Sequence, residues 1–306
     1  MHEGSQRAVL AAFLANLGVA IAKFFGFLFT GSASLLAETL HSVADTGNQL
    51  LLFLGAARAR RPATAAHPFG YGRERYFWSF IVAVVLFTVG SLFAITKGIQ
   101  SLREPHELEN PAWAVGILIF GLLLEGFSLR TAVISANRLR GTHSWWEFIR
   151  HAKTPELPVV LLEDFGALLG LLIALVCVGL ALYTGDPVYD AIGSLSIGIL
   201  LGVIALVLGA EMQSLLIGES ASKRMAQAIR EALESHSKLL RVVNLRTQHL
   251  GPDELLVAAE VELDQTLTGA ELAEVIDELE ARVRASTPIA RLIYIEPEVV
   301  PTEPGV

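Results

Sequence analysis

Long hydrophobic runs separated by short polar segments fill the first two thirds of the chain. Each run is long enough to cross a bilayer as a helix, which takes about 20 mostly apolar residues. We therefore expect an α-helical polytopic membrane protein whose transport domain covers residues 1–215. The six predicted transmembrane helices lie at about 8–30, 33–57, 75–101, 112–137, 157–183 and 188–210.

The remaining residues, 216–306, follow a different pattern and predict a small C-terminal domain. The segment VAAEVELD alternates apolar and polar residues as a half-buried strand does, and LAEVIDELEARV repeats apolar residues at helical spacing. A turn signal in LGPDELL separates two strands. We expect an α+β domain in the order αββαβ, with two helices on one side of the sheet. Its elements are predicted at 222–236, 240–249, 254–264, 268–284 and 290–298.

Composition agrees with a membrane protein and narrows the possible partners. Hydrophobic residues make up 53% of the 306 residues and charged residues 18%, whereas soluble domains average about 25% charged residues. The net charge of −8 argues against nucleic acid as a partner. Cys177 is the single cysteine, so the chain has neither an intrachain disulfide nor a thiolate metal cluster.

Lysine and arginine gather in alternate loops. The loops after the second, fourth and sixth predicted helices are basic, whereas the intervening loops share one arginine. Because basic loops stay on the cytoplasmic side, both termini and the C-terminal domain are expected there, in a prokaryotic plasma (inner) membrane. The basic residues are Arg58, Arg60, Arg61, Arg73, Arg75, Arg138, Arg140, Arg150, Lys153, Lys223 and Arg224.

Acidic side chains interrupt two of the predicted helices. The second helix carries His41 and Asp45, and the fifth carries Glu163 and Asp164. A charged group in lipid costs at least ~2.5–3.5 kcal/mol, so it needs a partner or a function. Residues four apart share a helix face, which places His41 beside Asp45. Asp45 lies ~18 Å from the outer edge of a ~30 Å hydrocarbon core, and the fifth-helix acids lie ~10 Å from its inner edge. All of these groups therefore lie at a similar depth.

One imidazole and two or three carboxylates form a ligand set that suits Zn²⁺, and also Mn²⁺, Fe²⁺ or Co²⁺. We predict a metal site at His41, Asp45, Glu163 and Asp164. The last two are adjacent and point about 100° apart, so the sequence leaves open which one binds the ion directly.

Simpler interpretations exist for the individual polar residues. An isolated histidine on an apolar helix face is often a hydrogen-bonded core residue. Lys23 and Glu38 lie at similar depth in the first two helices, and a structural ion pair accounts for both. Glu125 in the fourth helix is either part of an ion-entry path or a partner of Arg130.

Several segments resemble the cation diffusion facilitator family. They are SGSASLLAETLHSVADTGNQLLLFLG, RRPATAAHPFGYGRERYFW, GDPVYDAIGSLSIGILLG and VNLRTQHLGPDELLVAAEVELD, and VVLLEDFGALLG is most similar to a mitochondrial zinc-transporter branch. The resemblance implies six transmembrane helices, a metallochaperone-like cytoplasmic domain, a homodimer, and export of divalent metal ions in exchange for protons. The family's second-helix ligands fall on His41 and Asp45. Its fifth-helix ligands fall on Glu163 and Ala167, so Asp164 stands beside the expected position.

Two metal sites common in the family lack their ligands here. In the loop motif, Thr64 and Tyr71 occupy two ligand positions and leave His67 alone, so we expect that loop to bind no metal. The cytoplasmic domain is expected to be a dimerisation module with weak or no metal binding, with His236 and His249 at its surface. The positions that match the zinc-binding residues of many family members are occupied here by Val243, Glu260, Tyr294 and Glu296.

These features predict a divalent metal efflux transporter, with zinc/proton antiport as the leading interpretation. A manganese, iron or cobalt transporter and a membrane-bound metal sensor without flux remain alternatives. An intramembrane metalloprotease would need HExxH, which ETLHSVAD does not supply. We therefore expect no enzyme, no catalytic residues and no cofactor besides the transported ion.

Overall fold

A computed structural model describes residues 3–106, 110–141, 144–264 and 266–298, without the side chains of 3–15, 111, 138–139 and 150–151. The side chains at the start of the first predicted helix and those of Arg138 and Arg150 are therefore not described. The chain forms two compact units. One comprises Met1–Ala57 with Arg75–Gln213, and the other Arg58–Glu74 with Ser214–Val306.

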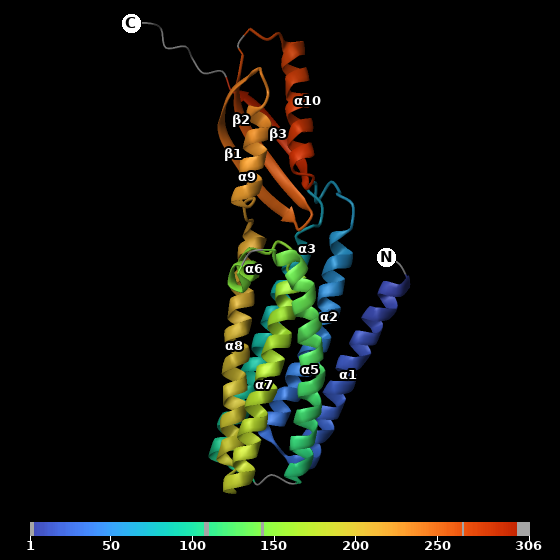
Figure 1. The fold of residues 1–306 in the computed structure, drawn as a ribbon, viewed down its shortest axis with the longest axis vertical. Helices are drawn as coiled ribbons and strands as arrows, with labels where there is room; N and C mark the ends of the chain where they lie inside the picture. Colours follow the sequence, from blue (N-terminus) through green and yellow to red (C-terminus); the bar gives the residue numbers. More distant parts are fainter. Residues whose placement is uncertain (1–2, 107–109, 142–143, 265, 299–306) are drawn as a thin grey trace, which may run out of the picture. The chain divides into compact units, whose positions relative to one another are not determined.

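The first unit is a bundle of long helices, as predicted (Figure 1). Four helical stretches are long and apolar enough to cross a membrane: Glu74–Arg103, Ala112–Asn137, Glu156–Thr184 and Val188–Ile217. The count of six spans remains our prediction. The helices are α1 (Glu3–Thr30), α2 (Ala33–Ala59), α3 (Glu74–Val85), α4 (Phe93–Arg103), α5 (Pro111–Arg140), α6 (Trp145–His151), α7 (Glu156–Thr184) and α8 (Val188–Ile217).

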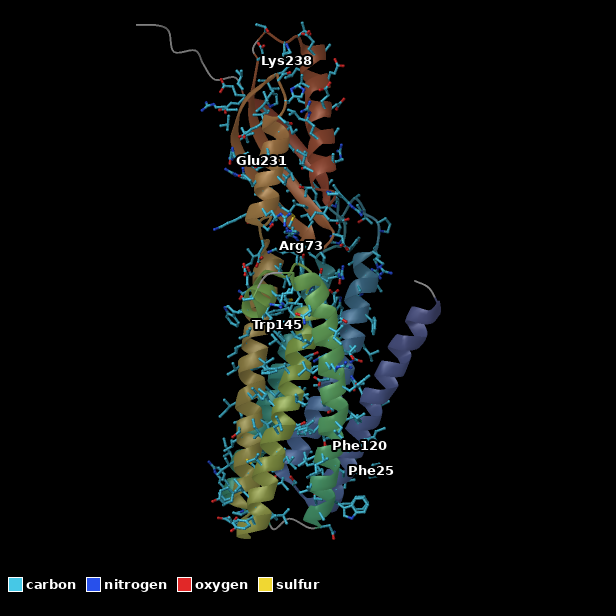
Figure 2. All side chains as sticks on the ribbon, viewed as in Figure 1. Phe25, Arg73, Phe120, Trp145, Glu231 and Lys238 are labelled. Atoms are coloured by element: carbon cyan, nitrogen blue, oxygen red, sulfur yellow. The ribbon has the colours of Figure 1, made fainter. Side chains whose placement is uncertain are left out.

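The bundle is apolar inside and apolar outside. Leu118 and Leu171 are completely buried in its core, whereas Phe25 on α1 and Phe120 on α5 are more than half exposed (Figure 2). Large exposed apolar side chains are unfavourable in water but suit the hydrocarbon region of a bilayer. Their distribution supports a membrane-embedded bundle.

A π-helical segment, Leu86–Leu92, interrupts the third predicted helix between α3 and α4. Small residues of α8 approach this region closely. Ser194 donates a hydrogen bond to the Ala94 carbonyl over 2.9 Å, and a Cβ on Gly198 would lie 3.0 Å from the Ser91 carbonyl oxygen. Hydrophobicity predicts a continuous helix here but carries no information on this local change of winding.

The second unit contains the predicted αββαβ domain. It comprises α9 (Lys223–Glu234), β1 (Leu239–Gly251), β2 (Glu254–Leu263), α10 (Gly269–Ser286) and β3 (Ala290–Glu298). The strand order is β1-β2-β3, with an antiparallel first pair and a parallel second pair.

Alternate residues of β2 build the core of this domain. Leu255, Val257 and Val261 are fully buried and belong to one hydrophobic cluster with Ile229 of α9 and Leu279 of α10. Both helices therefore cover the same face of the sheet. A capping box starts α10, where the Glu271 carboxylate accepts hydrogen bonds from the Thr268 backbone and hydroxyl; these bonds lower the pKa of Glu271.

The expectation that His236 and His249 are surface residues is wrong. His236 is 6% exposed and His249 is completely buried. His236 follows α9, and its Nε2 lies 2.8 Å from Glu278 of α10. His249 faces the core because it pairs with Leu255 in the β1–β2 register. The sequence predicts which residues of β1 share a face. It does not predict which of the two faces the helices cover at the end of the strand, where His249 lies.

The loop Arg58–Glu74 packs within the second unit. The Thr64 hydroxyl lies 3.3 Å from the Tyr71 hydroxyl, and the His67 and Tyr71 rings meet edge to face at 4.6 Å. The three residues that stand at the family's loop ligand positions thus contact one another. Gly72 lies against the β1–β2 turn, where the Leu250 carbonyl approaches it.

Substituting Gly72 should loosen this packing. A Cβ there would lie 2.6 Å from the Leu250 oxygen and 3.2 Å from the Gly251 Cα, and backbone atoms cannot move aside cheaply. We expect Gly72→Ala to cost about 1–3 kcal/mol, measured as a lower thermal midpoint in detergent. Gly269→Ala is the matched control, because a Cβ there meets no atom within 4 Å. Equal midpoints for the two variants would contradict the packing role.

Candidate functional site

The helix α2 presents a line of polar side chains to the interior of the bundle. His41, Asp45 and Asn48 follow one face at spacings of four and three residues. His41 is completely buried, and its Nε2 lies 3.5 Å from Asp45 Oδ2. Among the described residues, neither ring nitrogen of His41 has a hydrogen-bond partner, and Asp45 Oδ1 has none either. Buried polar atoms are normally paired, so these atoms are suited to receive a ligand.

The two adjacent acids of α7 face different neighbours, as their angular separation predicts. Glu163 is 4% exposed, and its Oε1 accepts a 2.6 Å hydrogen bond from Asn48 Nδ2 of α2. Asp164 Oδ2 accepts a 2.8 Å hydrogen bond from the Ser128 hydroxyl of α5. Neighbouring helices therefore hold each carboxylate in place.

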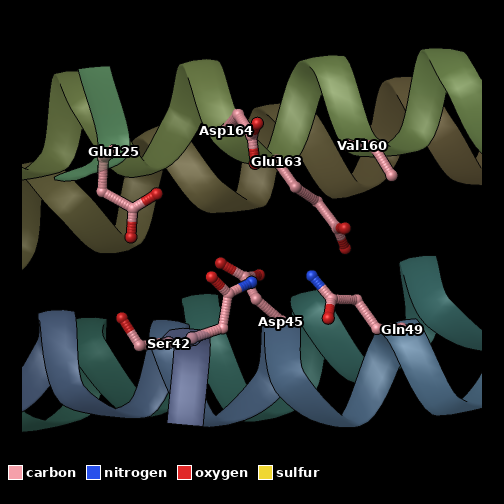
Figure 3. Close-up of a pocket in the computed structure, with 8 residues that line it drawn as sticks. Ser42, Asp45, Gln49, Glu125, Val160, Glu163 and Asp164 are labelled. Carbon is pink, nitrogen blue, oxygen red and sulfur yellow. The ribbon is translucent and has the colours of Figure 1, made fainter. Parts of the chain in front are cut away.

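Asp45, Glu163 and Asp164 line one small pocket. Figure 3 shows Asp45 from α2 facing Glu163 and Asp164 from α7, with Glu125 of α5 beside them. The cavity volume is about 10 Å³, which is of the order of one water molecule and suits a dehydrated ion. The described residues that line it are Asn16, Ser42, Asp45, Gln49, Glu125, Val160, Glu163 and Asp164.

The predicted ligands surround this pocket without converging on a single point. Within the described parts of the chain, no three histidine, cysteine, aspartate or glutamate side chains come together as a group that could hold a metal ion. His41 contacts Asp45 but does not line the cavity, while Glu163 and Asp164 are engaged by Asn48 and Ser128. Coordination by all four would require these side chains to reorient.

The simpler interpretation of Lys23 and Glu38 is confirmed. Lys23 Nζ lies 3.0 Å from Glu38 Oε2, and both side chains are almost completely buried. Glu125 lies 3.9 Å from the same ammonium group and lines the pocket. Its position favours the ion path over a pair with Arg130.

Sequence reasoning missed the neutral residues of the site. Asn48 carried a usable signal, because it lies three residues after Asp45 on the same face of a predicted span. Gln49, four residues after Asp45, carried the same signal, whereas Ser128 and Asn16 gave none, because neither shares a helix with a predicted ligand.

Asn48 should support metal binding through Glu163. Asn48→Ala removes the donor of the 2.6 Å bond, and loss of such a supporting group typically costs about 10–100-fold in metal affinity or activity. We expect that increase in the KM for metal in a transport assay. Asn137→Ala is the matched control, because Asn137 of α5 is exposed, does not line the pocket and accepts its hydrogen bond from Arg140, so KM should change little. Wild-type kinetics in Asn48→Ala would show that Glu163 needs no such support.

Comparisons with known proteins identify the class. The model for the cation efflux transmembrane domain matches residues 9–217, and that for the cation efflux protein cytoplasmic domain matches 221–298. The chain belongs to the cation efflux family, a family of membrane transporters.

Relatives come from animals, plants and bacteria. The mouse mitochondrial proton-coupled zinc antiporter SLC30A9 is 34% identical over 86% of this chain and 47% of its own length. Metal tolerance protein C4 of Arabidopsis thaliana is 33% identical over 85% of this chain and 57% of its own. The cation-efflux pump FieF of Pectobacterium atrosepticum is 26% identical over 94% of this chain and 90% of its own. The chain thus spans about half the length of the animal relatives.

Proposed function

We propose that this protein exports divalent metal ions, zinc foremost, in exchange for protons. The transport site consists of His41, Asp45, Glu163 and Asp164. The observation that carries the proposal is the small pocket shared by Asp45 of α2 and by Glu163 and Asp164 of α7. The names of the relatives, a proton-coupled zinc antiporter and a cation-efflux pump, support the same activity.

Coupling to protons follows from the ligand chemistry. A histidine or carboxylate binds metal in its deprotonated form, so metal entry expels protons and protonation expels metal. His41 suits this exchange because an unperturbed imidazole has a pKa of ~6.5. Two conformations of the bundle that differ in their affinity for metal and protons would then move the ion across the membrane.

The surroundings of the transporter are also part of the proposal. The basic loops favour a cytoplasmic C-terminal domain, and we propose the plasma (inner) membrane, although the animal relatives are named mitochondrial.

We propose a homodimer formed through the C-terminal domain. The sheet face opposite its helices carries Glu260, Tyr294 and Glu296, of which Tyr294 is 55% exposed. These side chains favour a dimerisation module over a metal store.

Metal flux into proteoliposomes under an imposed pH gradient tests the function. Zn²⁺, Mn²⁺, Fe²⁺ and Co²⁺ are offered in turn to the wild type and to Asp45→Ala. Proton-coupled zinc uptake that the variant lacks is the expected result. Uptake of a different ion would assign the substrate to that metal, and stoichiometric binding without flux would favour the sensor.

A further inference from the structure

A buried lysine lies at the edge of the pocket. Lys23 of α1 is 1% exposed, and its ammonium group donates to Glu38 Oε2 over 3.0 Å and to the Ser42 hydroxyl over 2.8 Å. Its third neighbour is Glu125 Oε1 of α5, at 3.9 Å. Ser42 and Glu125 both line the pocket. The cation therefore contacts two residues of the pocket lining in addition to its partner in the ion pair.

The contacts of the cluster exceed those of a simple structural pair. One ammonium group is shared between two carboxylates that come from two different helices, α2 and α5. Glu38 Oε1 has no hydrogen-bond partner among the described residues. Of the two acids, Glu38 is fully buried and does not line the cavity, whereas Glu125 is 15% exposed and lines it.

We infer that Lys23 acts as a tethered cation that sets where the transported ion rests and how tightly it binds. This inference rests on the proposed function. The ammonium group offsets part of the negative charge of Glu125, so an entering divalent ion is drawn mainly to the acids of α2 and α7. The ammonium group also repels that ion, because charges inside the bundle are only weakly screened by water. Both effects weaken binding enough for the ion to be released within a transport cycle.

The inference predicts opposite changes in affinity and turnover when the charge is removed. Glu125 would then keep its full negative charge and act as an additional carboxylate in the pocket. Metal should bind at least ~10-fold more tightly, with a lower KM, while the maximal rate falls because release becomes slow. A purely structural pair predicts neither change once the fold is preserved.

The test uses paired substitutions, because Lys23→Met alone leaves Glu38 buried without its partner. Lys23→Met/Glu38→Gln removes both charges together, and such neutral replacements of buried pairs are commonly tolerated. Zinc affinity is measured by titration of the purified full chain in detergent, and KM and maximal rate in proteoliposomes. Adding Glu125→Gln to the pair should return the affinity toward the wild-type value, since the additional carboxylate is gone. Lys23→Arg, which keeps the charge, should stay near wild type.

The outcomes separate this inference from the proposed function. Tighter zinc binding in the pair, reversed by Glu125→Gln, supports the tethered cation whether or not flux is seen. A folded pair with wild-type affinity and kinetics overturns it and leaves Lys23 as a structural partner of Glu38. Absence of flux in the wild type contradicts the proposed function instead, and the titrations still decide the role of Lys23.

Discussion

Asp45→Ala should abolish metal transport. Asp45 is the carboxylate that α2 contributes to the pocket, opposite Glu163 and Asp164 and 3.5 Å from His41. Loss of a group that merely supports a ligand costs about 10–100-fold, so loss of a ligand itself should lower flux by ~100-fold or more. Zinc uptake into proteoliposomes under a pH gradient measures the effect. Removing one charge from a pocket crowded with acids should leave the fold intact, so the variant should purify normally.

Asp186→Ala is the matched control for this experiment. Asp186 lies on the exposed turn between α7 and α8, where its carboxylate accepts a hydrogen bond from the Val188 backbone. It is an acid of the same type that lies far along the chain from the pocket, and its removal should leave zinc uptake near the wild-type rate. Wild-type uptake by Asp45→Ala would remove Asp45 from the site and with it the proposed ligand set.

The parts of the site that the sequence predicts are those that follow from helix geometry alone. The spacing of four residues places His41 beside Asp45, and the depth estimate brings the α2 and α7 acids to one cavity. The bonds from Asn48 to Glu163 and from Ser128 to Asp164 depend on how each helix is rotated about its axis. Hydrophobic periodicity gives that rotation too coarsely to select one polar partner.

A similar limit applies to the fold. The αββαβ order and most strand bounds follow from apolar periodicity, because one face of the sheet is buried under α9 and α10. The π-helical segment Leu86–Leu92 does not follow, because apolar periodicity carries no information on a local change of helical winding. The contact of Gly72 with the Leu250 carbonyl is equally hidden, since it joins residues far apart in the sequence.

Asp190→Ala should strongly destabilise the bundle. Asp190 of α8 is 4% exposed and accepts hydrogen bonds from the Ser32 hydroxyl at 2.7 Å, the Ala33 amide at 2.6 Å and the Ser34 amide at 3.2 Å. It thereby caps the first turn of α2 from another helix. Hydrogen bonds to a charged group contribute about 1.5–3 kcal/mol each, and the freed amides belong to the buried residues Ala33 and Ser34. We expect a loss of about 3 kcal/mol or more, measured as a lower thermal midpoint in detergent.

The contrast between Asp190 and Asp45 separates stability from transport. Asp190→Asn keeps one acceptor oxygen and should fall between the wild type and Asp190→Ala, while Asp186→Ala again serves as the exposed control. An unchanged midpoint in Asp190→Ala would show that the cap contributes little. Because α2 carries His41 and Asp45, fraying its first turn should also reduce flux in Asp190→Ala. That loss should recover at temperatures well below the midpoint, whereas the loss in Asp45→Ala should persist at every temperature, since a missing ligand cannot be restored by folding.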